Sequence, residues 1–441
     1  MDATTLFIVG MFLLVGSAVL VGELFSRLGQ APLVGQLLVG VVLGPTLLGD
    51  PLGLSSLGTE FQSLQFLATF FILMMAGLSV TPQQIRATGF ASALLGIAIF
   101  LLPFILGAGL VRVLYPGMST TETLFVSLTI SITALPVLGV MLREFGLMES
   151  RFGSLLMNTS LVNELAAVTT FAVLLRVNSD PHSAGIAIAT SLLTVGIFLT
   201  SVLAVHYTMR ALRQNQLWDR LVDRFRERWR TREAGFAVLL VFGLGAALYS
   251  QLLGLTFLVG AFYAGLLITP ESAGRREHRT INFIFEAVTW GFFIPLFFAL
   301  VGFGMNFRLL GTSLLPILAF AVLVVFALFS KVFVGSAVAR SLGWSANESF
   351  CAGFLVSSRG AVELAMAVIL LGDGIFSTQV YTVVAGVGLL TTIFAPIGAR
   401  PFVRAITAER RAIDEHSPAT PLSPSFPPPT LFTGPDEPPR V

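Results

Sequence analysis

The stretch Thr159-Ser-Leu-Val-Asn163-Glu164-Leu-Ala-Ala-Val-Thr-Thr170 lies in the middle of an apolar run that extends from about Glu149 to Val177. That run is long enough to cross a bilayer as a helix, and Asn163 and Glu164 lie at its midpoint. An ionised carboxylate at this depth is costly and is usually kept for a function. The alternative is a protonated Glu164 that a neighbouring helix satisfies by hydrogen bonding. The polar residues elsewhere in the chain favour an ion site at the middle of the membrane.

The composition is that of a membrane protein with many spans. Of 441 residues, 55% are hydrophobic and only 11% are charged, and the mean hydropathy is +0.87. Cys351 is the only cysteine, which excludes intrachain disulfides and a CxxC redox pair. The sequence contains no HExxH, GxSxG or Walker A motif, and its four histidines lack metal-ligand spacing. We therefore expect neither an enzyme nor a bound cofactor.

Thirteen apolar segments predict an all-α polytopic fold with thirteen transmembrane helices. Arginine is distributed very unevenly between the loops, with twenty-one residues after odd-numbered segments or in the C-terminal end and three after even-numbered segments. By the positive-inside rule, the N-terminus lies outside a cell (inner) membrane and the C-terminus lies in the cytoplasm. The segments run approximately over residues 5–26, 31–49, 63–80, 89–115, 121–143, 149–177, 184–210, 235–254, 256–270, 282–305, 314–339, 347–372 and 377–403.

The predicted membrane domain covers residues 1–403. The count of segments divides it into two six-helix halves of opposite orientation, over about 1–177 and 235–403. Such inverted repeats are common in transporters. The fifth segment of each half is interrupted near its centre, by Thr133-Ala-Leu-Pro136 in the first and by Ser357-Ser358-Arg359-Gly360 in the second. Unwound backbone at membrane depth is tolerated only where protein buries it or where it lines a cavity. We therefore expect two broken helices whose half-helix dipoles point at the same place, at the middle of the membrane.

Lys331 is the only lysine in the chain and lies about three residues from the midpoint of its segment. One interpretation is that its side chain snorkels to the inner surface. The other is a buried ammonium that takes part in the ion site, where a compact, readily titrated charge suits proton exchange. Ser131 and Thr133 add hydroxyl groups at the first break.

The linker between the halves and the C-terminal end of the chain have a different character. Residues 184–234 link the halves, and the aromatic and basic residues of 213–232 predict an amphipathic helix on anionic lipid, with a solvated loop as the alternative. Nucleic-acid binding is not expected. Residues 404–441 are polar and rich in proline, which predicts a disordered cytoplasmic tail.

Five motifs resemble those of the bacterial monovalent cation:proton antiporters, the superfamily of Nha, Nap and Kef proteins. The resemblance spans nearly all of residues 20–400. Its motifs, in order, are Arg27-Leu-Gly-Gln-Ala-Pro-Leu-Val-Gly-Gln-Leu-Leu-Val-Gly-Val-Val-Leu-Gly-Pro45, Thr133-Ala-Leu-Pro-Val137, Asn163-Glu164, Pro295-Leu-Phe-Phe-Ala-Leu-Val-Gly302, and Lys331 with Arg359-Gly-Ala-Val-Glu363.

This resemblance implies a homodimer in which a scaffold domain carries a core domain. The core domain would contain two crossed broken helices and would move like an elevator. It implies that Glu164 binds both the cation and the proton, with Lys331 as the buried lysine beside it. Arg359 and Glu363 would compensate helix dipoles. The implied site residues are Asn163, Glu164, Thr133, Ser131 and Ser160 as cation ligands, with Pro136, Ser357, Ser358, Arg359, Gly360 and Glu363 at the crossing.

The chain departs from the family pattern at three positions. Asn163 replaces the acid that pairs with the lysine in electrogenic members, Glu164 replaces the usual Asp, and Gln36 stands where many relatives carry Glu. The expected function is exchange of Na⁺ or K⁺ for protons, with the choice of cation left open. A sodium-coupled symporter for an organic anion, a passive cation channel and an intramembrane hydrolase are the alternatives.

Overall fold

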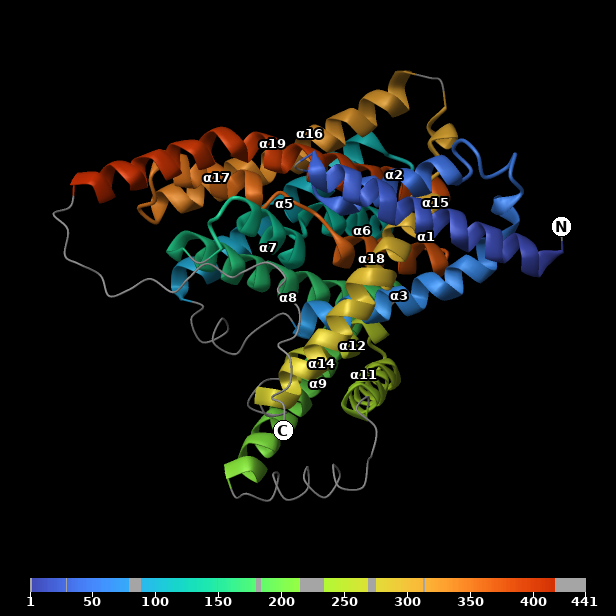
Figure 1. Cartoon of the computed structure of the whole chain (residues 1–441), viewed down its shortest axis with the longest axis horizontal. Coiled ribbons are helices and arrows are strands. Elements are labelled where there is room, and N and C mark those ends of the chain that lie inside the picture. The colour runs from blue at the N-terminus through green and yellow to red at the C-terminus, as the bar shows by residue number, and fades with distance from the viewer. Residues whose placement is uncertain are drawn as a thin grey trace, which may run out of the picture.

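The computed structural model of the chain describes residues 2–28, 30–78, 89–148, 150–179, 184–214, 234–268, 275–311 and 314–416. These residues form helices and connecting turns, with no strand among them, so the all-α expectation is confirmed (Figure 1). The helices are α1 (Ala3–Arg27), α2 (Pro32–Leu43), η1 (Leu54–Leu57), α3 (Gly58–Leu78), α5 (Phe90–Leu114), α6 (Thr120–Ser131), α7 (Leu135–Glu144), α8 (Arg151–Ser179), α9 (Ala184–Gln214), α11 (Ala234–Leu252), α12 (Phe257–Leu267), α14 (Arg275–Val288), the π-helical turn η3 (Thr289–Phe293), α15 (Ile294–Gly304), η4 (Phe307–Leu310), α16 (Leu314–Ser341), α17 (Ala346–Leu355), α18 (Ala361–Gly372) and α19 (Thr378–His416).

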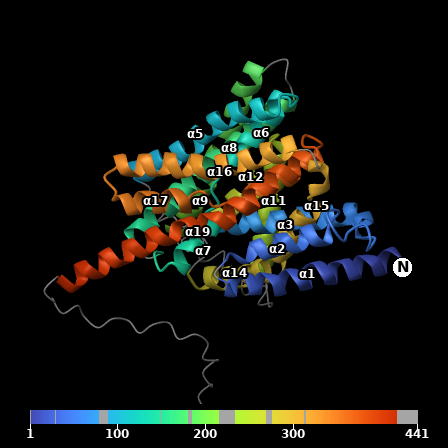
Figure 2. The same cartoon turned by 90° about the horizontal axis from the view of Figure 1, so that it is seen from above.

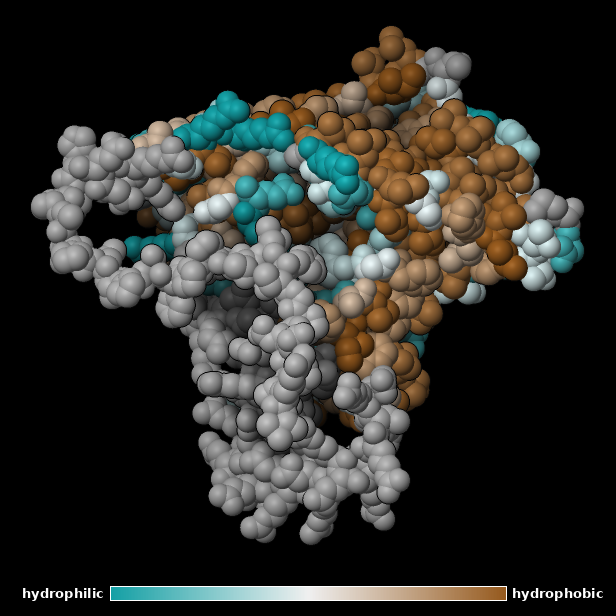
Figure 3. All heavy atoms as spheres, viewed as in Figure 1, coloured by the Kyte–Doolittle hydropathy of each residue, from teal (hydrophilic) through white to brown (hydrophobic). Residues whose placement is uncertain are grey.

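Nine helical stretches in the described residues are long and apolar enough to cross a membrane. The other predicted segments contain shorter apolar helices, at Pro32–Leu43, Leu193–Thr208, Phe257–Leu267 and Ala361–Gly372. The structure therefore shows a polytopic membrane protein, and the count of thirteen crossings stays a prediction. A broad apolar surface covers the side of the molecule on which α1, α3 and α15 lie (Figure 3), as lipid contact requires.

The start of α1 and the end of α19 lie at opposite ends of the molecule in both cartoon views (Figures 1 and 2). That arrangement agrees with an odd number of crossings. The predicted boundary of the cytoplasmic tail at residue 404 is wrong, because α19 continues as a helix to His416. Ile406 is buried, and the Glu409 carboxylate accepts a hydrogen bond of 2.7 Å from Asn347 at the start of α17. The predicted lipid-binding helix falls mainly on residues 215–233, which lie outside the described residues, as do residues 417–441.

Both predicted helix breaks are present. The first separates α6 from α7 at Ile132–Ala134, where residues 132 and 134 are extended. Pro136 lies in the first turn of α7, a position that needs no intrahelical N–H, so it starts the second half-helix rather than kinking a continuous one. The second break separates α17 from α18 and contains the predicted residues 357–360.

The helix packing follows the pairing that an inverted repeat predicts. In such a repeat α2 corresponds to α12, and α3 corresponds to the helix that ends in α15. The closely packed pair α2–α15 therefore corresponds to the pair α12–α3, which is packed just as closely. The hairpin α1–α2 likewise corresponds to the hairpin α11–α12.

Glycines allow the two corresponding crossings. A side chain at Gly40 of α2 would overlap the carbonyl oxygen of Ala299 in α15, and one at Gly302 would overlap that of Leu37. At the other crossing, Gly77 of α3 faces Phe262 of α12 in the same way, and Gly265 faces Met74. Small residues at helix interfaces let backbones approach closely in membranes.

The close crossing of α2 and α15 predicts that one added methyl group destabilises the protein strongly. We expect Gly40→Ala to lower the thermal unfolding midpoint of the purified protein, because over-packing of this kind costs about 1–3 kcal/mol. Gly16→Ala in α1 is the matched control, since the added Cβ meets no atom within 4 Å. Equal unfolding midpoints for the two variants would contradict the close crossing.

Candidate functional site

Asn163 spans the first break. This fully buried side chain extends from α8 and uses both ends of its amide on the unwound backbone. Its Oδ1 accepts a hydrogen bond of 2.7 Å from the Thr133 N–H, and its Nδ2 donates one of 3.1 Å to the Ser131 carbonyl. A neutral side chain thus satisfies one backbone donor and one backbone acceptor of the helix break.

Lys331 reaches the same break from α16. Its ammonium donates to the Ile132 carbonyl at 2.5 Å and to the Thr133 hydroxyl at 2.7 Å. The Thr133 hydroxyl in turn donates to the Val356 carbonyl at 2.6 Å, which connects the first break to the second. Because Lys331 is fully buried, the snorkelling interpretation is wrong.

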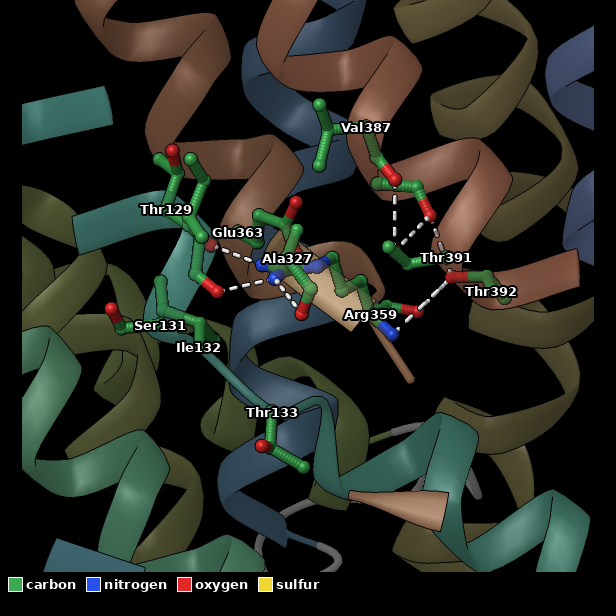
Figure 4. Close-up of polar contacts among 12 residues, drawn as sticks. Thr129, Ser131, Ile132, Thr133, Ala327, Arg359, Glu363, Val387, Thr391 and Thr392 are labelled. Atoms are coloured by element: carbon green, nitrogen blue, oxygen red, sulfur yellow. Dashed lines mark hydrogen bonds and ion pairs between the residues drawn. The ribbon is translucent and has the colours of Figure 1, made fainter. Parts of the chain in front are cut away.

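Arg359 extends from the second break to the end of α6. Its guanidinium donates to the Thr129 carbonyl at 2.6 Å and to the Ile130 carbonyl, and it lies 3.5 Å from the Glu363 carboxylate (Figure 4). Glu363 lies in the first turn of α18, where a negative charge suits the positive end of the helix dipole. Arg359 similarly suits the negative end of α6, so the two residues lie where dipole compensation requires them.

Taken in order, the five carbonyl oxygens from Thr129 to Thr133 all accept hydrogen bonds from side chains. The donors are Arg359 for the first two, Asn163 for Ser131, Lys331 for Ile132 and Ser160 for Thr133. The Ser160 bond is the weakest of these, at 3.5 Å. The Thr133 carbonyl is therefore the one that is most available to another partner.

Glu164 differs from its polar neighbours. Its side chain is fully buried, and neither carboxylate oxygen has a hydrogen-bond partner among the described residues. A buried carboxylate with two unused oxygens, beside a helix break, has the capacity to bind a proton or a cation.

The remaining predicted residues line the crossing. Ser131 donates its hydroxyl to the Ser127 carbonyl within its own helix. The hydroxyls of Ser357 and Ser358 donate to Phe354 and Leu355, also within one turn. The Ser358 carbonyl accepts a hydrogen bond of 3.3 Å from the Ala134 N–H. A side chain at Gly360 would overlap Ala134 and Val137, so the two breaks cross in direct contact.

The structure also brings a residue to the crossing that sequence reasoning missed. Thr392 of α19 contacts the backbone of Arg359 in the second break. A buried threonine in an apolar helix carries no signal of its own. Its correspondence to Asn163, which lies on the last helix of the other half, could have identified it.

Comparison with known proteins decides the family. A family model described as sodium/hydrogen exchanger, transmembrane, matches residues 12–405. The chain belongs to the sodium/hydrogen exchanger family. Members of this family are cation/proton antiporters and hence transporters rather than enzymes, which removes the hydrolase alternative.

Individual relatives match over most of their length. The chain is similar to the Na⁺/H⁺-K⁺ antiporter GerN of Bacillus cereus, with 26% identity over 382 residues that cover 86% of this chain and 92% of GerN. It is also similar to the Na⁺/H⁺ antiporter NhaS4 of Synechocystis sp., with 26% identity over 411 residues that cover 89% and 96%. The sodium proton antiporter MjNhaP1 from Methanocaldococcus jannaschii has the same fold, with a TM-score of 0.70 at 14% identity, over 94% of this chain and 99% of MjNhaP1.

Proposed function

We propose that this exchanger-family protein moves a monovalent cation, Na⁺ or K⁺, in one direction and a proton in the other, with Glu164 as the carboxylate that binds both. The observation that carries the proposal is the state of Glu164. It is buried at the middle of α8, its carboxylate has no hydrogen-bond partner in the part of the chain that the structure describes, and it directly follows Asn163, which is bonded to the first helix break. A charged group kept in such a place is expected to be functional.

The geometry also favours a particular ligand set. Glu164, the Ser160 hydroxyl and the weakly bonded Thr133 carbonyl offer oxygen atoms to a partly dehydrated cation. Asn163 and the Ser131 carbonyl are bonded to one another, and the Thr133 hydroxyl is bonded to Lys331 and Val356. We infer that Asn163, Ser131 and the Thr133 hydroxyl hold the break rather than contact the cation.

Competition for one carboxylate gives coupled exchange. Ionised Glu164 binds the cation, and protonated Glu164 cannot. Moving an empty, ionised site through the low-dielectric core is costly, so only the loaded forms change sides. The proposed movement is elevator-like, with the crossing and its ligands carried as one body.

This scheme predicts electroneutral exchange. In this scheme Lys331, Arg359 and Glu363 keep the same charge throughout the cycle, so binding of either a proton or a monovalent cation to ionised Glu164 gives the same net charge. We expect that cation-driven proton flux in proteoliposomes will not change when the membrane potential is clamped at different values with ionophores.

The competing scheme makes Lys331 a second proton carrier that loses its proton when the cation binds. That scheme requires a flux that accelerates with an imposed potential, and the acceleration would disappear in Lys331→Gln. Observation of both effects would contradict electroneutral exchange. The neutral Asn163 favours the first scheme, because it stands where electrogenic members carry the acid that pairs with the lysine.

Two rival functions remain and predict different results. A passive channel would conduct cations without moving protons, and a sodium-coupled symporter would require an organic anion. The deciding experiment is reconstitution with a pH-sensitive dye inside liposomes, followed by addition of Na⁺, K⁺ or Li⁺ in turn. We expect saturable proton movement with at least Na⁺ or K⁺ alone. Flux that is neither saturable nor proton-coupled would contradict the proposal.

The resemblance and the arginine distribution also support a proposal about the oligomeric state, the membrane orientation and the lipid contacts of the protein. We propose a homodimer in a cell (inner) membrane, with α1 starting outside and α19 ending in the cytoplasm. Anionic lipid at residues 213–232 is part of the same proposal.

A further inference from the structure

We propose that Thr392 is a positioning residue of the exchange site, holding the second break as Asn163 holds the first. This inference deepens the proposed function and rests on it for its transport readout. The Thr392 hydroxyl accepts a hydrogen bond of 3.2 Å from the Arg359 N–H and lies 3.0 Å from the Arg359 carbonyl, to which it can donate (Figure 4). The Gly388 carbonyl, at 2.8 Å, is the alternative acceptor for the same proton.

The arrangement matches that of Asn163 in two respects. Asn163 lies on α8, the last helix of the first half, and Thr392 lies on α19, the last helix of the second half. Each is buried, and each offers one acceptor and one donor to an N–H and a C=O of the broken segment in its own half. Unwound backbone that is buried in protein at membrane depth needs such partners, because the lipid offers no hydrogen bonds.

A continuous set of contacts connects Thr392 to the proposed cation ligands. Thr392 fixes the backbone at Arg359, which follows Ser358. The Ser358 carbonyl accepts from the Ala134 N–H, and the Val356 carbonyl accepts from the Thr133 hydroxyl. Movement of the second break would therefore move Thr133, whose carbonyl is a proposed ligand, and would also withdraw Arg359 from the end of α6.

Loss of positioning by Thr392 should weaken binding of the cation more than binding of the proton. A cation needs several oxygen atoms at fixed positions, whereas a proton needs only one carboxylate oxygen. Loss of positioning should thus raise the KM for the cation with little change in maximal rate. A defect confined to folding would instead lower the maximal rate, because fewer molecules work, and leave KM unchanged.

The chain offers a matched control at the adjacent position. Thr391 is equally buried, but among the described residues its hydroxyl donates only to Val387 and Gly388 within its own helix. Thr392→Val and Thr391→Val each replace a hydroxyl by a methyl group of nearly the same size. Only the first of them removes a contact with the second break.

The experiment compares these variants in full-length protein reconstituted into liposomes, with initial rates measured against cation concentration. For Thr392→Val we expect a KM on the order of tenfold higher, as loss of paired buried hydrogen bonds allows, and a maximal rate near that of wild type. Thr391→Val should match wild type, and Thr392→Ser should restore a low KM because it restores the hydroxyl. An unchanged KM in Thr392→Val, an equal rise in Thr391→Val or failure of Thr392→Ser to rescue would each overturn the assignment.

A second readout does not depend on transport. Cys351, the only cysteine, is fully buried in α17, the helix that leads into the second break. We expect a membrane-permeant maleimide to label Cys351 faster in Thr392→Val membranes than in Thr391→Val membranes. Equal labelling would contradict the role of Thr392, whether or not the wild-type protein exchanges cations. Failure of the wild-type protein to exchange cations would refute only the proposed function. If Thr392→Val does not accumulate, Thr392→Ala makes the same comparison.

Discussion

Replacing Glu164 by Gln is expected to reduce cation-driven proton movement to the level of protein-free liposomes. Gln keeps the size of the side chain and its hydrogen-bonding capacity, but it cannot exchange a proton and offers no charge to a cation. The folded protein should be at least as stable as wild type, because a neutral amide replaces a buried carboxylate for which the described residues supply no hydrogen-bond partner. Flux in reconstituted liposomes and the thermal unfolding midpoint in detergent measure the two effects separately.

The control for this variant is Glu23→Gln. Glu23 is an exposed carboxylate near the end of α1 that forms an ion pair of 3.0 Å with Arg27. Its replacement should leave both flux and unfolding midpoint unchanged, since exposed ion pairs contribute about 0–1 kcal/mol. Substantial exchange by purified Glu164→Gln would remove Glu164 as the carrier.

The second large effect is expected at Arg359. Arg359→Gln leaves Glu363 buried without its ion-pair partner and removes the cation that satisfies the end of α6. Breaking a buried pair from one side costs about 3–5 kcal/mol. We therefore expect a large fall in the yield and unfolding midpoint of the variant, with much of the loss recovered by the double substitution Arg359→Gln with Glu363→Gln.

An exposed pair provides the comparison. Arg308 and Asp50 are closer, at 3.1 Å against 3.5 Å, but their side chains are 53% and 54% exposed, while those of Arg359 and Glu363 are 1% exposed. If burial decides the energy, Arg308→Gln should have a much smaller effect despite the shorter distance. A smaller effect for Arg359→Gln than for Arg308→Gln would show that the buried pair is not needed for the fold.

The position of the site could be predicted from the sequence because charge is rare in this chain. Glu164, Lys331 and Arg359 each interrupt an apolar segment, and the requirement to bury such groups brings their helices together. Proline and glycine likewise marked both breaks. The first break lies where the sequence predicts it, and Pro136 occupies the first turn of α7, where its missing N–H leaves no intrahelical bond unmade.

Other features depend on contacts that a sequence does not encode locally. Asn163 was predicted as a cation ligand, whereas its amide is used on both sides of the break. Side-chain donors from α8, α16 and the second break decide which carbonyl of the first break stays available to a cation. Thr392 was missed because a threonine in an apolar helix usually bonds within its own helix, as Thr391 does.

Competition between one proton and one cation at Glu164 can be measured directly, without transport. Na⁺ or K⁺ is added to the purified protein in weakly buffered, slightly acidic detergent solution, with a pH-indicator dye for released protons and calorimetry for bound cation. We expect saturable release of one proton for each cation bound, and no release from Glu164→Gln. Cation binding without proton release in wild type, or the same release from the variant, would contradict the mechanism.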